Sequence, residues 1–382
     1  MIDRDFLTRT LIDIVQINSA NPSLTPGSPG EAEIGAYLAQ LMKSAGLQVF
    51  THTLAPQRFN VVGILPGTGG GKSLLLNAHM DTVGFEGMPD PLSGKIRDGR
   101  VYGRGSQDMK GSLAAMVAAA LAVKSLAVPL RGDLIIACVA DEEYASLGTE
   151  DLVRHYHADA AIVTEPTDLV IGLAHRGFML FEVETTGRAA HGSRYTEGID
   201  AIMHMGRFLS GLDRLEKELL QRSPHPHAGP PSIHTSTIQG GSEWSIYPAH
   251  CQLAIERRSI PGETVDSALA ELQQIIDQLS REDRQFNATV RSVFWRSSFE
   301  IDPQAEIVRL VEQAVAQKLK KPPRYGGASF WTDAALLSEA GIPSLLLGPA
   351  GAGLHSAEEW VDLQSTFDLA EILEQTTLEF CR

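Results

Sequence analysis

The stretch SLLLNAHMD, residues 73–81, is an apolar run that ends in a histidine and an aspartate. A short apolar run of this kind is typical of a strand that is buried on both faces, as in the parallel sheets of α/β proteins. Side chains alternate along a strand, so His79 and Asp81 are expected on the same side of the extended chain. An imidazole whose second ring nitrogen meets a carboxylate is common in metal sites. The strand alone does not decide this, and further ligands must come from elsewhere in the chain.

Acidic side chains follow two other apolar runs at the points where these runs end. Residues 133–140 lead into an Asp-Glu-Glu triplet, and residues 160–163 lead into a Thr-Glu-Pro triplet. A further acidic residue comes just before the alanine-rich helical pattern of residues 112–123. Open α/β sheets bind ligands at the carboxyl ends of their strands, so these side chains are expected to converge. The residues concerned are Asp108, Glu142, Glu143 and Glu165.

The rest of the chain shows two patterns of hydrophobic residues. Buried strands alternate with helical spacing up to about residue 177 and again from residue 306, which indicates an α/β sheet covered by helices. Between them, loosely alternating strands and two amphipathic helical patterns indicate an inserted antiparallel α+β domain. In the α/β part of the chain we expect helices at residues 3–17, 30–44, 306–320 and 366–380 and strands at 47–52, 60–65 and 344–347. In the insert we expect helices at residues 199–219 and 265–279 and strands at 178–184, 233–238, 251–257 and 288–293.

Composition limits the classes of protein that remain. The 382 residues carry 47 acidic against 32 basic side chains, a formal net charge of −15. Without a local basic patch, this balance argues against nucleic acid or an anionic membrane as partner and favours cations. Three widely spaced cysteines fit a reducing cytosol. Because the chain starts on a charged amphipathic segment and has no apolar run of membrane-spanning length, we expect a cytoplasmic protein.

Converging carboxylates suggest that cations lie among them, because partly buried carboxylates repel one another and resist ionisation. A second imidazole is available from His355, in the glycine-rich segment GAGLHS at 351–356. Three ionised carboxylates and two neutral imidazoles around two divalent ions set a charge of about −3 against +4. The remaining positive charge would polarise a carbonyl and lower the pKa of bound water. Such nitrogen and oxygen ligands favour zinc, with cobalt or manganese as substitutes.

Each of these residues also has a simpler interpretation. Asp108 could cap the helix that follows it, and a Glu-Glu pair after a strand often begins a solvated helix. His355 could be a loop histidine beside flexible glycines. Five further histidines have no motif around them, and we expect surface or core packing for them. These are His52, His155, His157, His204 and His250.

Taken in order, five segments resemble the signature of the dinuclear metallopeptidases, a family that includes acetylornithine deacetylase, succinyl-diaminopimelate desuccinylase, aminoacylase and glutamate carboxypeptidase. The resemblance covers essentially the whole chain. It implies a catalytic domain with a mixed sheet between helices at residues 1–177 and 293–382. It also implies an inserted α+β lid at residues 178–292, through which two copies form a homodimer. The five segments are HMDTV (79–83), GRGSQDMKG (103–111), DEE (141–143), TEP (164–166) and the late His355.

The resemblance also implies chemistry for the signature. Glu142 matches the general base, which takes a proton from a water that bridges the metals while this water attacks an amide carbonyl. Asp81 matches the residue that supports His79. Family members carry a non-proline cis peptide after the bridging aspartate, which predicts one at Asp108–Met109. The implied metal ligands are His79 and Glu165 for one ion, Glu143 and His355 for the other, and Asp108 as the bridge.

Two segments of the lid carry further matches to the family. His191, in GRAAHGS at 187–193, matches the histidine that reaches the partner subunit's site and stabilises the tetrahedral oxyanion. Arg258, in ERRSIPG at 256–262, matches the arginine that grips a substrate carboxylate, and Arg257 is the alternative. In the catalytic domain, Asp333 and Gly353 lie in loops that match family loops near the substrate.

The function that follows is hydrolysis of an amide bond in a small N-acyl amino acid with a free carboxylate. Glutamate at position 165 resembles the deacylase branch of the family, whereas aspartate is more usual in the carboxypeptidase branch. A carboxypeptidase or dipeptidase is therefore the alternative. A non-catalytic homologue that binds metals or metabolites is a third possibility, but such a protein has no need of Glu142.

Overall fold

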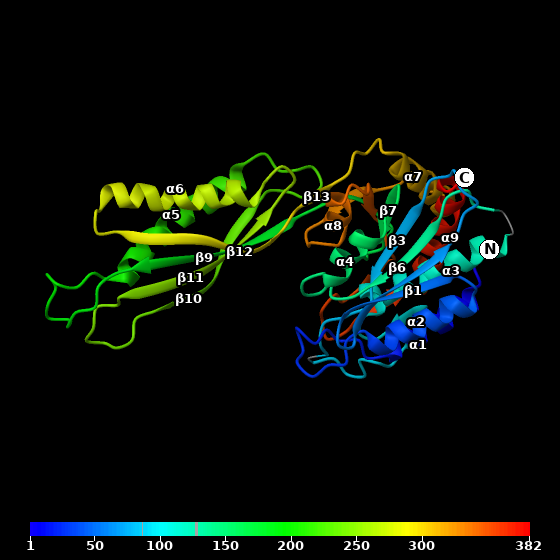
Figure 1. Ribbon diagram of the computed structural model, residues 1–382, viewed down its shortest axis with the longest axis horizontal. Helices are drawn as coiled ribbons and strands as arrows, with labels where there is room; N and C mark the ends of the chain where they lie inside the picture. The colour runs from blue at the N-terminus through cyan, green and yellow to red at the C-terminus, as the bar shows by residue number, and fades with distance from the viewer. Residues whose placement is uncertain (86, 127–128) are drawn as a thin grey trace. The chain divides into compact units, whose positions relative to one another are not determined.

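The structure is a computed structural model that describes residues 1–85, 87–126 and 129–382 (Figure 1). The chain divides into two compact units. The first comprises Met1–Leu173, Ile301–Gly327 and Thr332–Arg382, and the second comprises Ala174–Glu300 and Ala328–Trp331. The range 178–292, expected as an insert, lies inside the second unit.

A mixed sheet forms the centre of the first unit. Its strands follow the order β1-β2-β6-β3-β7-β15-β8, and β14 also pairs with β8. The short strand β13, whose residues belong to the second unit, pairs with Ala174 and His175 at the end of β8. The pairs β6·β3, β3·β7 and β7·β15 are parallel, and the pairs β1·β2, β2·β6 and β15·β8 are antiparallel. The strands are β1 (Gln48–Ala55), β2 (Arg58–Leu65), β3 (Leu74–His79), β6 (Leu134–Val139), β7 (Ala160–Val163), β8 (Ile171–His175), β13 (Phe299–Glu300), β14 (Tyr325–Ala328) and β15 (Ser344–Leu346).

Helices cover both faces of this sheet. In Figure 1, α3, α7 and α9 lie against one face, and α4 and α8 lie against the other. Every residue of β3 and β6 is buried between these layers, which explains why both strands are apolar almost throughout. The helices of the unit are α1 (Arg4–Gln16), α2 (Ala32–Ser44), α3 (Gly111–Ser125), α4 (Leu147–His155), α7 (Glu306–Leu319), α8 (Ala334–Glu339) and α9 (Leu363–Phe380).

The parallel register aligns the carboxyl ends of the central strands. His79, the last residue of β3, pairs with Val139, the last residue of β6, and Asn77 pairs with Val163 at the end of β7. The segments that follow these three strands therefore leave the sheet at one edge. A small sheet of order β16-β17-β5-β4 lies in the same unit. Its strands are β4 (Lys95–Arg97), β5 (Arg100–Tyr102), β16 (Gly351–Ala352) and β17 (Trp360–Asp362).

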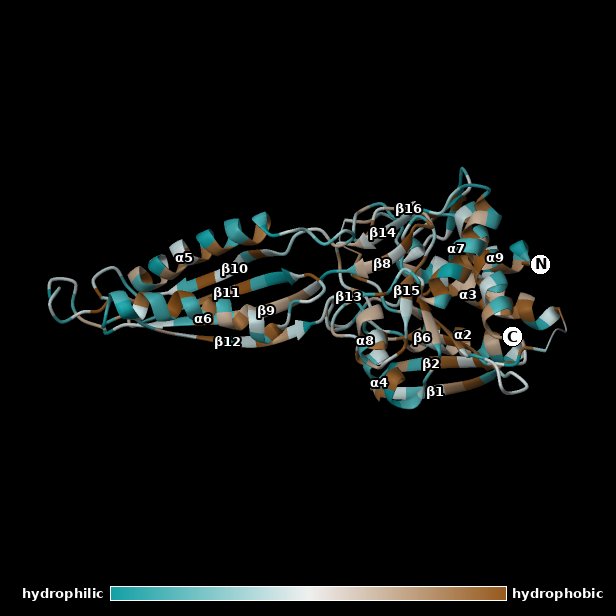
Figure 2. Cartoon of the chain, turned by 90° about the horizontal axis from the view of Figure 1, so that it is seen from above, coloured by the Kyte–Doolittle hydropathy of each residue, from teal (hydrophilic) through white to brown (hydrophobic). Residues whose placement is uncertain are grey.

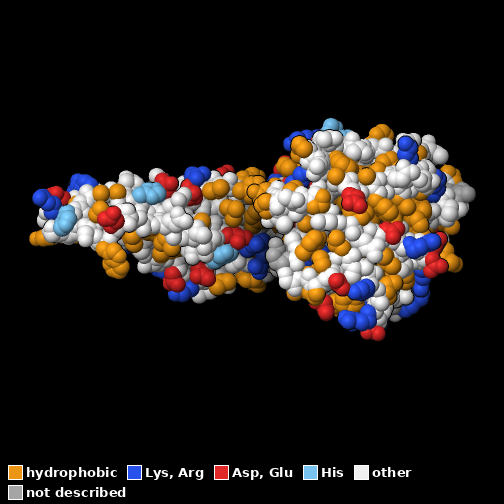
Figure 3. Space-filling model, turned by 90° about the horizontal axis from the view of Figure 1, so that it is seen from below, with side chains coloured by type: hydrophobic (Ala, Val, Ile, Leu, Met, Phe, Trp, Pro, Cys, Tyr) orange, Lys and Arg blue, Asp and Glu red, His pale blue; other side chains and the backbone are white. Residues whose placement is uncertain are grey.

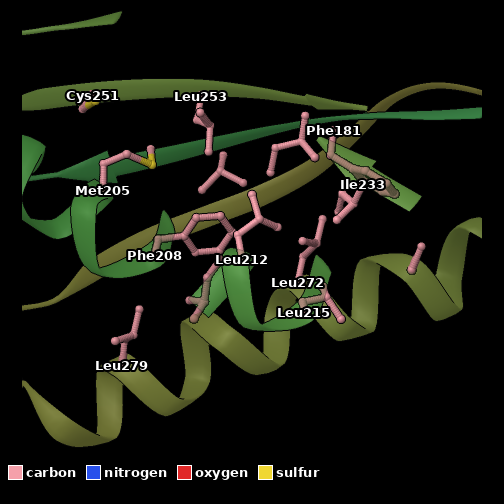
Figure 4. Close-up of a cluster of buried hydrophobic side chains, with 14 of the residues drawn as sticks. Phe181, Met205, Phe208, Leu212, Leu215, Ile233, Cys251, Leu253, Leu272 and Leu279 are labelled. Atoms are coloured by element: carbon pink, nitrogen blue, oxygen red, sulfur yellow. The ribbon is translucent and has the colours of Figure 1, made fainter. Parts of the chain in front are cut away.

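The second unit is an antiparallel sheet of order β10-β11-β9-β12 with α5 and α6 on one face (Figure 1). Both helices show hydrophobic and hydrophilic stripes in Figure 2, and their apolar residues pack on the sheet. The core includes Phe181, Phe208, Leu212 and Leu253, which lie between the helices and the sheet (Figure 4). The elements are β9 (Gly177–Thr186), β10 (Ser232–Gly240), β11 (His250–Ser259), β12 (Asn287–Arg296), α5 (Ala201–Gln221) and α6 (Val265–Glu282).

The structure confirms the expected fold class, a mixed sheet between helices with an α+β unit, and adds elements that the sequence did not indicate. The missed elements include α4, β8 and the short strands of the small sheet, which are too short or too mixed in pattern to stand out. Among the described residues, no helix has the length and apolarity needed to cross a membrane. On the face shown in Figure 3, acidic and basic side chains are interspersed on both units.

Candidate functional site

The ends of three central strands bring together side chains that lie far apart in sequence. His79 ends β3, Glu142 and Glu143 follow β6, and Glu165 follows β7. Asp108 lies in the segment Ser106–Lys110, which leads into α3, and the backbone of Asp108 and Met109 is not helical. The peptide bond between Asp108 and Met109 is cis, as predicted.

His79, Asp108 and Glu165 form one group of possible metal ligands, with one ligand atom of each residue within 4.8 Å of the others. Nε2 of His79 lies 3.0 Å from Oδ1 of Asp108. Nδ1 of His79 donates to the backbone carbonyl of Asp81 at 2.8 Å. Since a carbonyl only accepts, this bond puts the ring proton on Nδ1 and leaves Nε2 to face the carboxylates.

Asp108, Glu143 and His355 form a second group, again with ligand atoms within 4.8 Å of one another. Nε2 of His355 lies 3.4 Å from Oδ2 of Asp108 and 3.1 Å from Oε2 of Glu143. The two oxygens of Asp108 thus face different imidazoles, one in each group. The chain turns sharply at His355, whose φ is 56°, and at Asp141 beside the glutamate pair, whose φ is 71°.

Asp81 contacts its neighbours differently from the arrangement expected from the sequence. Its carboxylate lies 3.8 Å from Nδ1 of His79, and the backbone carbonyl of Asp81 accepts the hydrogen bond from this nitrogen instead. The carboxylate accepts hydrogen bonds from the backbone amides of Glu142 and Glu143, at 3.1 and 3.2 Å, and from the side-chain amide of Asn21 at 2.7 Å. Asp81 therefore fixes His79 through its main chain and the two glutamates through its side chain.

The electrostatics of the site favour added positive charge. Burial and the neighbouring carboxylates raise the pKa of Glu142 and of Glu165 well above the ordinary value. Burial opposes ionisation of Asp108 as well, but the hydrogen bonds from His355 and His79 hold the pKa of Asp108 well below its usual range. Hydrogen bonds to Asp108 and Glu143 raise the pKa of His355 to about 10.

A buried oxygen atom without a hydrogen-bond partner also favours added positive charge in the site. Oε1 of Glu143 is buried and has no hydrogen-bond partner within the described part of the chain. A buried carboxylate oxygen without a partner is costly, and a metal ion would satisfy it. With three carboxylates, two imidazoles and Asp108 common to both groups, the donor set fits a pair of divalent ions.

Two further predicted site residues lie in the first unit. Asp333 precedes α8, accepts a hydrogen bond from Oγ1 of Thr149 at 2.7 Å, and has its pKa raised to about 6 by burial. Gly353 has a φ of 93°, and a Cβ at this position would lie 1.8 Å from the carbonyl oxygen of Glu358. In this structure Gly353 therefore permits the tight turn that carries His355.

Sequence reasoning missed Glu359, a buried residue next to β17. Its carboxylate accepts hydrogen bonds from the backbone amides of Gly105, Gln107 and Asp108 at 3.0 to 3.1 Å and forms an ion pair with Arg104 at 2.8 Å. Glu359 thus connects the loop of Asp108 to the loop of His355. Its place four residues after His355 is the one signal that the sequence offered.

The two arginines of the second unit differ in their surroundings. Arg257 is 1% exposed, and its guanidinium forms ion pairs with Glu263 and Glu271 inside the unit. Arg258 is 36% exposed, pairs with Glu256 at 2.6 Å and lies over the ring of Phe178. Because Arg258 is much the more exposed of the two, these surroundings favour Arg258 over Arg257 as the group that meets a ligand.

His191 lies in an exposed loop of the second unit. Its Nδ1 lies 2.8 Å from Oγ of Ser193, and its backbone forms an isolated β-bridge with Ile246. The loop thus leaves Nε2 of the imidazole for another partner.

The comparisons with known proteins agree with this geometry. The model of Peptidase family M20/M25/M40 matches residues 75–379. The acetylornithine deacetylase of Myxococcus xanthus is 30% identical over 98% of this chain and 97% of its own length. The N-formyl-4-amino-5-aminomethyl-2-methylpyrimidine deformylase of Bacillus subtilis is 29% identical over 94% and 92%. The structure of the Bacillus subtilis YXEP protein, a dinuclear metal-binding peptidase, matches with a TM-score of 0.77 at 14% identity over 99% and 98%.

The fold and the site define a hydrolase of the metallopeptidase and amidohydrolase class. Within that class, the chain belongs to Peptidase family M20/M25/M40.

Replacing Glu359 tests whether it positions the loop of Asp108. In Glu359→Gln the side-chain amide would face backbone amides that need an acceptor, so we expect the affinity for Zn²⁺ to fall about 10- to 100-fold. Titration of chelator-treated protein with Zn²⁺ measures this change. The exposed neighbour Glu358 provides the control, and Glu358→Gln should bind as the wild type does. Equal affinity in all three proteins would contradict the positioning role.

Proposed function

We propose that this protein hydrolyses the amide bond of a small N-acyl amino acid that carries a free carboxylate, as an acetylornithine deacetylase-like or succinyl-diaminopimelate desuccinylase-like deacylase. The observation that carries the proposal is Glu142. It is an additional carboxylate beside the two ligand groups, it belongs to neither of them, and its pKa is raised by burial and by Glu165. A group that only stores metal would gain nothing from such a residue.

The ligand groups are proposed to hold two divalent ions per chain; their nitrogen and oxygen donors favour zinc, with cobalt or manganese as substitutes. When bound, such ions polarise a carbonyl and lower the pKa of water. His79 and Glu165 would hold one ion, Glu143 and His355 the other, and the two oxygens of Asp108 would serve both.

Glu142 is proposed to act as the general base. Its raised pKa suits a carboxylate that accepts a proton from the attacking water and then returns this proton to the leaving amine. The hydrogen bond from the Glu142 amide to Asp81 holds its backbone in place. Asp81 is therefore a positioning residue for both the base and His79.

The second unit is proposed to be a lid that forms the interface of a homodimer in the cytoplasm. His191 would stabilise the oxyanion in the partner's site, and Arg258 would bind the substrate carboxylate. The exposure of both side chains supports these roles. Asp333 and Gly353 would shape the substrate side of the site.

The comparisons support the proposed kind of acyl group. The relatives named above are a deacetylase and a deformylase, which supports a deacylase. The alternative is a carboxypeptidase or dipeptidase, which the likeness to a dinuclear peptidase fold keeps open.

Removing the carboxylate of Glu142 should separate metal binding from catalysis. We expect Glu142→Ala to keep the metal content of the wild type and to lose at least about 10²- to 10⁴-fold in kcat, because the carboxylate proposed to accept the proton is removed. Atomic emission of dialysed protein gives the metal content, and single-turnover kinetics give the rate. Glu358→Ala serves as the control, and near-normal turnover in Glu142→Ala would refute the assignment of the base.

A substrate panel tests the proposed specificity. N-acetylornithine, N-succinyl-diaminopimelate, other N-acetyl and N-formyl amino acids, and dipeptides are compared by kcat/KM with Zn²⁺-loaded protein. We expect kcat/KM to be higher for N-acyl amino acids than for dipeptides. Arg258→Ala should raise KM about tenfold or more for these substrates and leave it nearly unchanged for their carboxamide analogues, since only the carboxylate pairs with the guanidinium. A preference for dipeptides would favour the alternative function.

Mixing of inactive variants tests the role of His191 across a dimer. Glu142→Ala and His191→Ala are each expected to be nearly inactive alone. After mixing under conditions that allow subunit exchange, a mixed dimer has one site with both groups intact, so up to about a quarter of wild-type activity should return when half of the dimers are mixed. Analytical ultracentrifugation verifies the dimer. No recovery from dimers that do exchange would place His191 outside the partner's site.

A further inference from the structure

A second cluster of possible metal-binding side chains lies in the first unit and contains none of the residues of the candidate catalytic site. His52 comes from β1, and Asp151 and His155 come from α4, where they are four residues apart. One ligand atom from each residue lies within 4.8 Å of the other two. The two histidines have no motif around them in the sequence, and tertiary folding places them together.

One distance within this cluster matches the spacing of ligands around a bound ion, and a second distance, to the other oxygen of Asp151, is longer. Nε2 of His155 lies 3.3 Å from Oδ1 of Asp151, and Nδ1 of His52 lies 3.9 Å from Oδ2 of the same carboxylate. Ligand atoms around a tetrahedral ion, each about 2.0–2.1 Å from the metal, are about 3.3 Å apart. Small rotations of the His52 and His155 rings would therefore bring all three atoms to coordinating positions.

A hydrogen bond orients His52 in the manner typical of metal ligands. Its Nε2 lies 2.8 Å from the hydroxyl of Tyr156, so this contact fixes the ring and turns Nδ1 toward Asp151. The rings of His52 and His155 stack with centroids 4.8 Å apart, which restricts their movement further.

The carboxylate of Asp151 lacks a partner where the ion would bind. Its Oδ2 is buried, and no described group gives it a hydrogen bond. An ordinary helical pair between Asp151 and His155 accounts for Oδ1 and leaves Oδ2 unexplained.

We propose that His52, Asp151 and His155 bind a further divalent cation, separate from the candidate catalytic pair. Two imidazoles and one carboxylate suit zinc, cobalt or nickel better than magnesium or calcium. His155 is 49% exposed, so water can complete the coordination and an ion can enter from solvent.

The ion would join the edge strand β1 to the carboxyl end of α4. This helix matters to the rest of the unit, because Thr149 donates to Asp333 and Gly148 donates to the carbonyl of Ala140. The bound ion would therefore stabilise the unit and would leave the catalytic groups untouched. Its effect should appear in metal stoichiometry and thermal stability, and activity should not change.

The test is a titration of the full-length, chelator-treated protein with Zn²⁺, followed by calorimetry and by equilibrium dialysis with metal analysis. Wild-type protein should bind one equivalent more than His52→Ala, His155→Ala or Asp151→Asn. The exposed neighbour His157 provides the matched control, and His157→Ala should bind as many equivalents as the wild type. Equal stoichiometry in the wild type and the three cluster variants would overturn the proposal.

Thermal unfolding gives an independent readout. Saturating Zn²⁺ should raise the Tm of the wild type by about 2–4 °C more than that of His155→Ala, since the ion binds only the folded cluster. The metal-free forms show whether the variant folds normally, and Asp151→Asn replaces it if it does not. An equal rise in Tm for wild type and variants would contradict a stabilising ion. Because the comparison is a difference of one equivalent, its outcome does not depend on the proposed catalytic metals.

Discussion

Asp108 faces His79 with one carboxylate oxygen and His355 with the other, and the organisation of the site depends on this shared carboxylate. Glu142, Glu143 and Glu165 lie near it in a buried region, where burial and neighbouring carboxylates oppose their ionisation. Such a cluster is stable only with positive charge among its members. The raised pKa of His355 and the unpartnered oxygen of Glu143 are two expressions of this requirement.

Much of the surrounding structure serves to hold these groups at fixed positions. Two buried carboxylates hold these segments by accepting hydrogen bonds from backbone amides. They do not themselves belong to the ligand groups. Asp81 holds the amides of Glu142 and Glu143, and Glu359 holds the amides in the turn of Asp108. Because backbone amides cannot move independently of their segment, each carboxylate positions a whole loop. The loop that carries His355 is tied to the turn of Asp108 through the same Glu359.

The two units contribute differently to the proposed reaction. The first supplies a rigid edge, where the register of parallel strands determines which side chains meet. The second supplies exposed polar groups on an antiparallel α+β layer. Adjacent residues on one of its strands can be buried and exposed in turn. Arg257 points into the unit and is paired with two glutamates, whereas Arg258 on the other face of β11 is half-exposed. The alternation of a strand decides this difference.

The sequence by itself determined the apolar strands, the acidic residues at their ends and the ordered signature around His79, because hydrophobic period and short spacing are local properties. It also gave the α+β character of the insert. Tertiary structure alone decided which partner each polar group has. The carboxylate of Asp81 accepts hydrogen bonds from glutamate amides, and the backbone carbonyl of Asp81 accepts the one from the His79 ring. Glu359 contacts the turn of Asp108, more than 250 residues away in sequence. The ring of His52 stacks on that of His155. These pairings depend on strand order and register, which bring distant segments to one edge of the sheet and leave no local pattern in the chain.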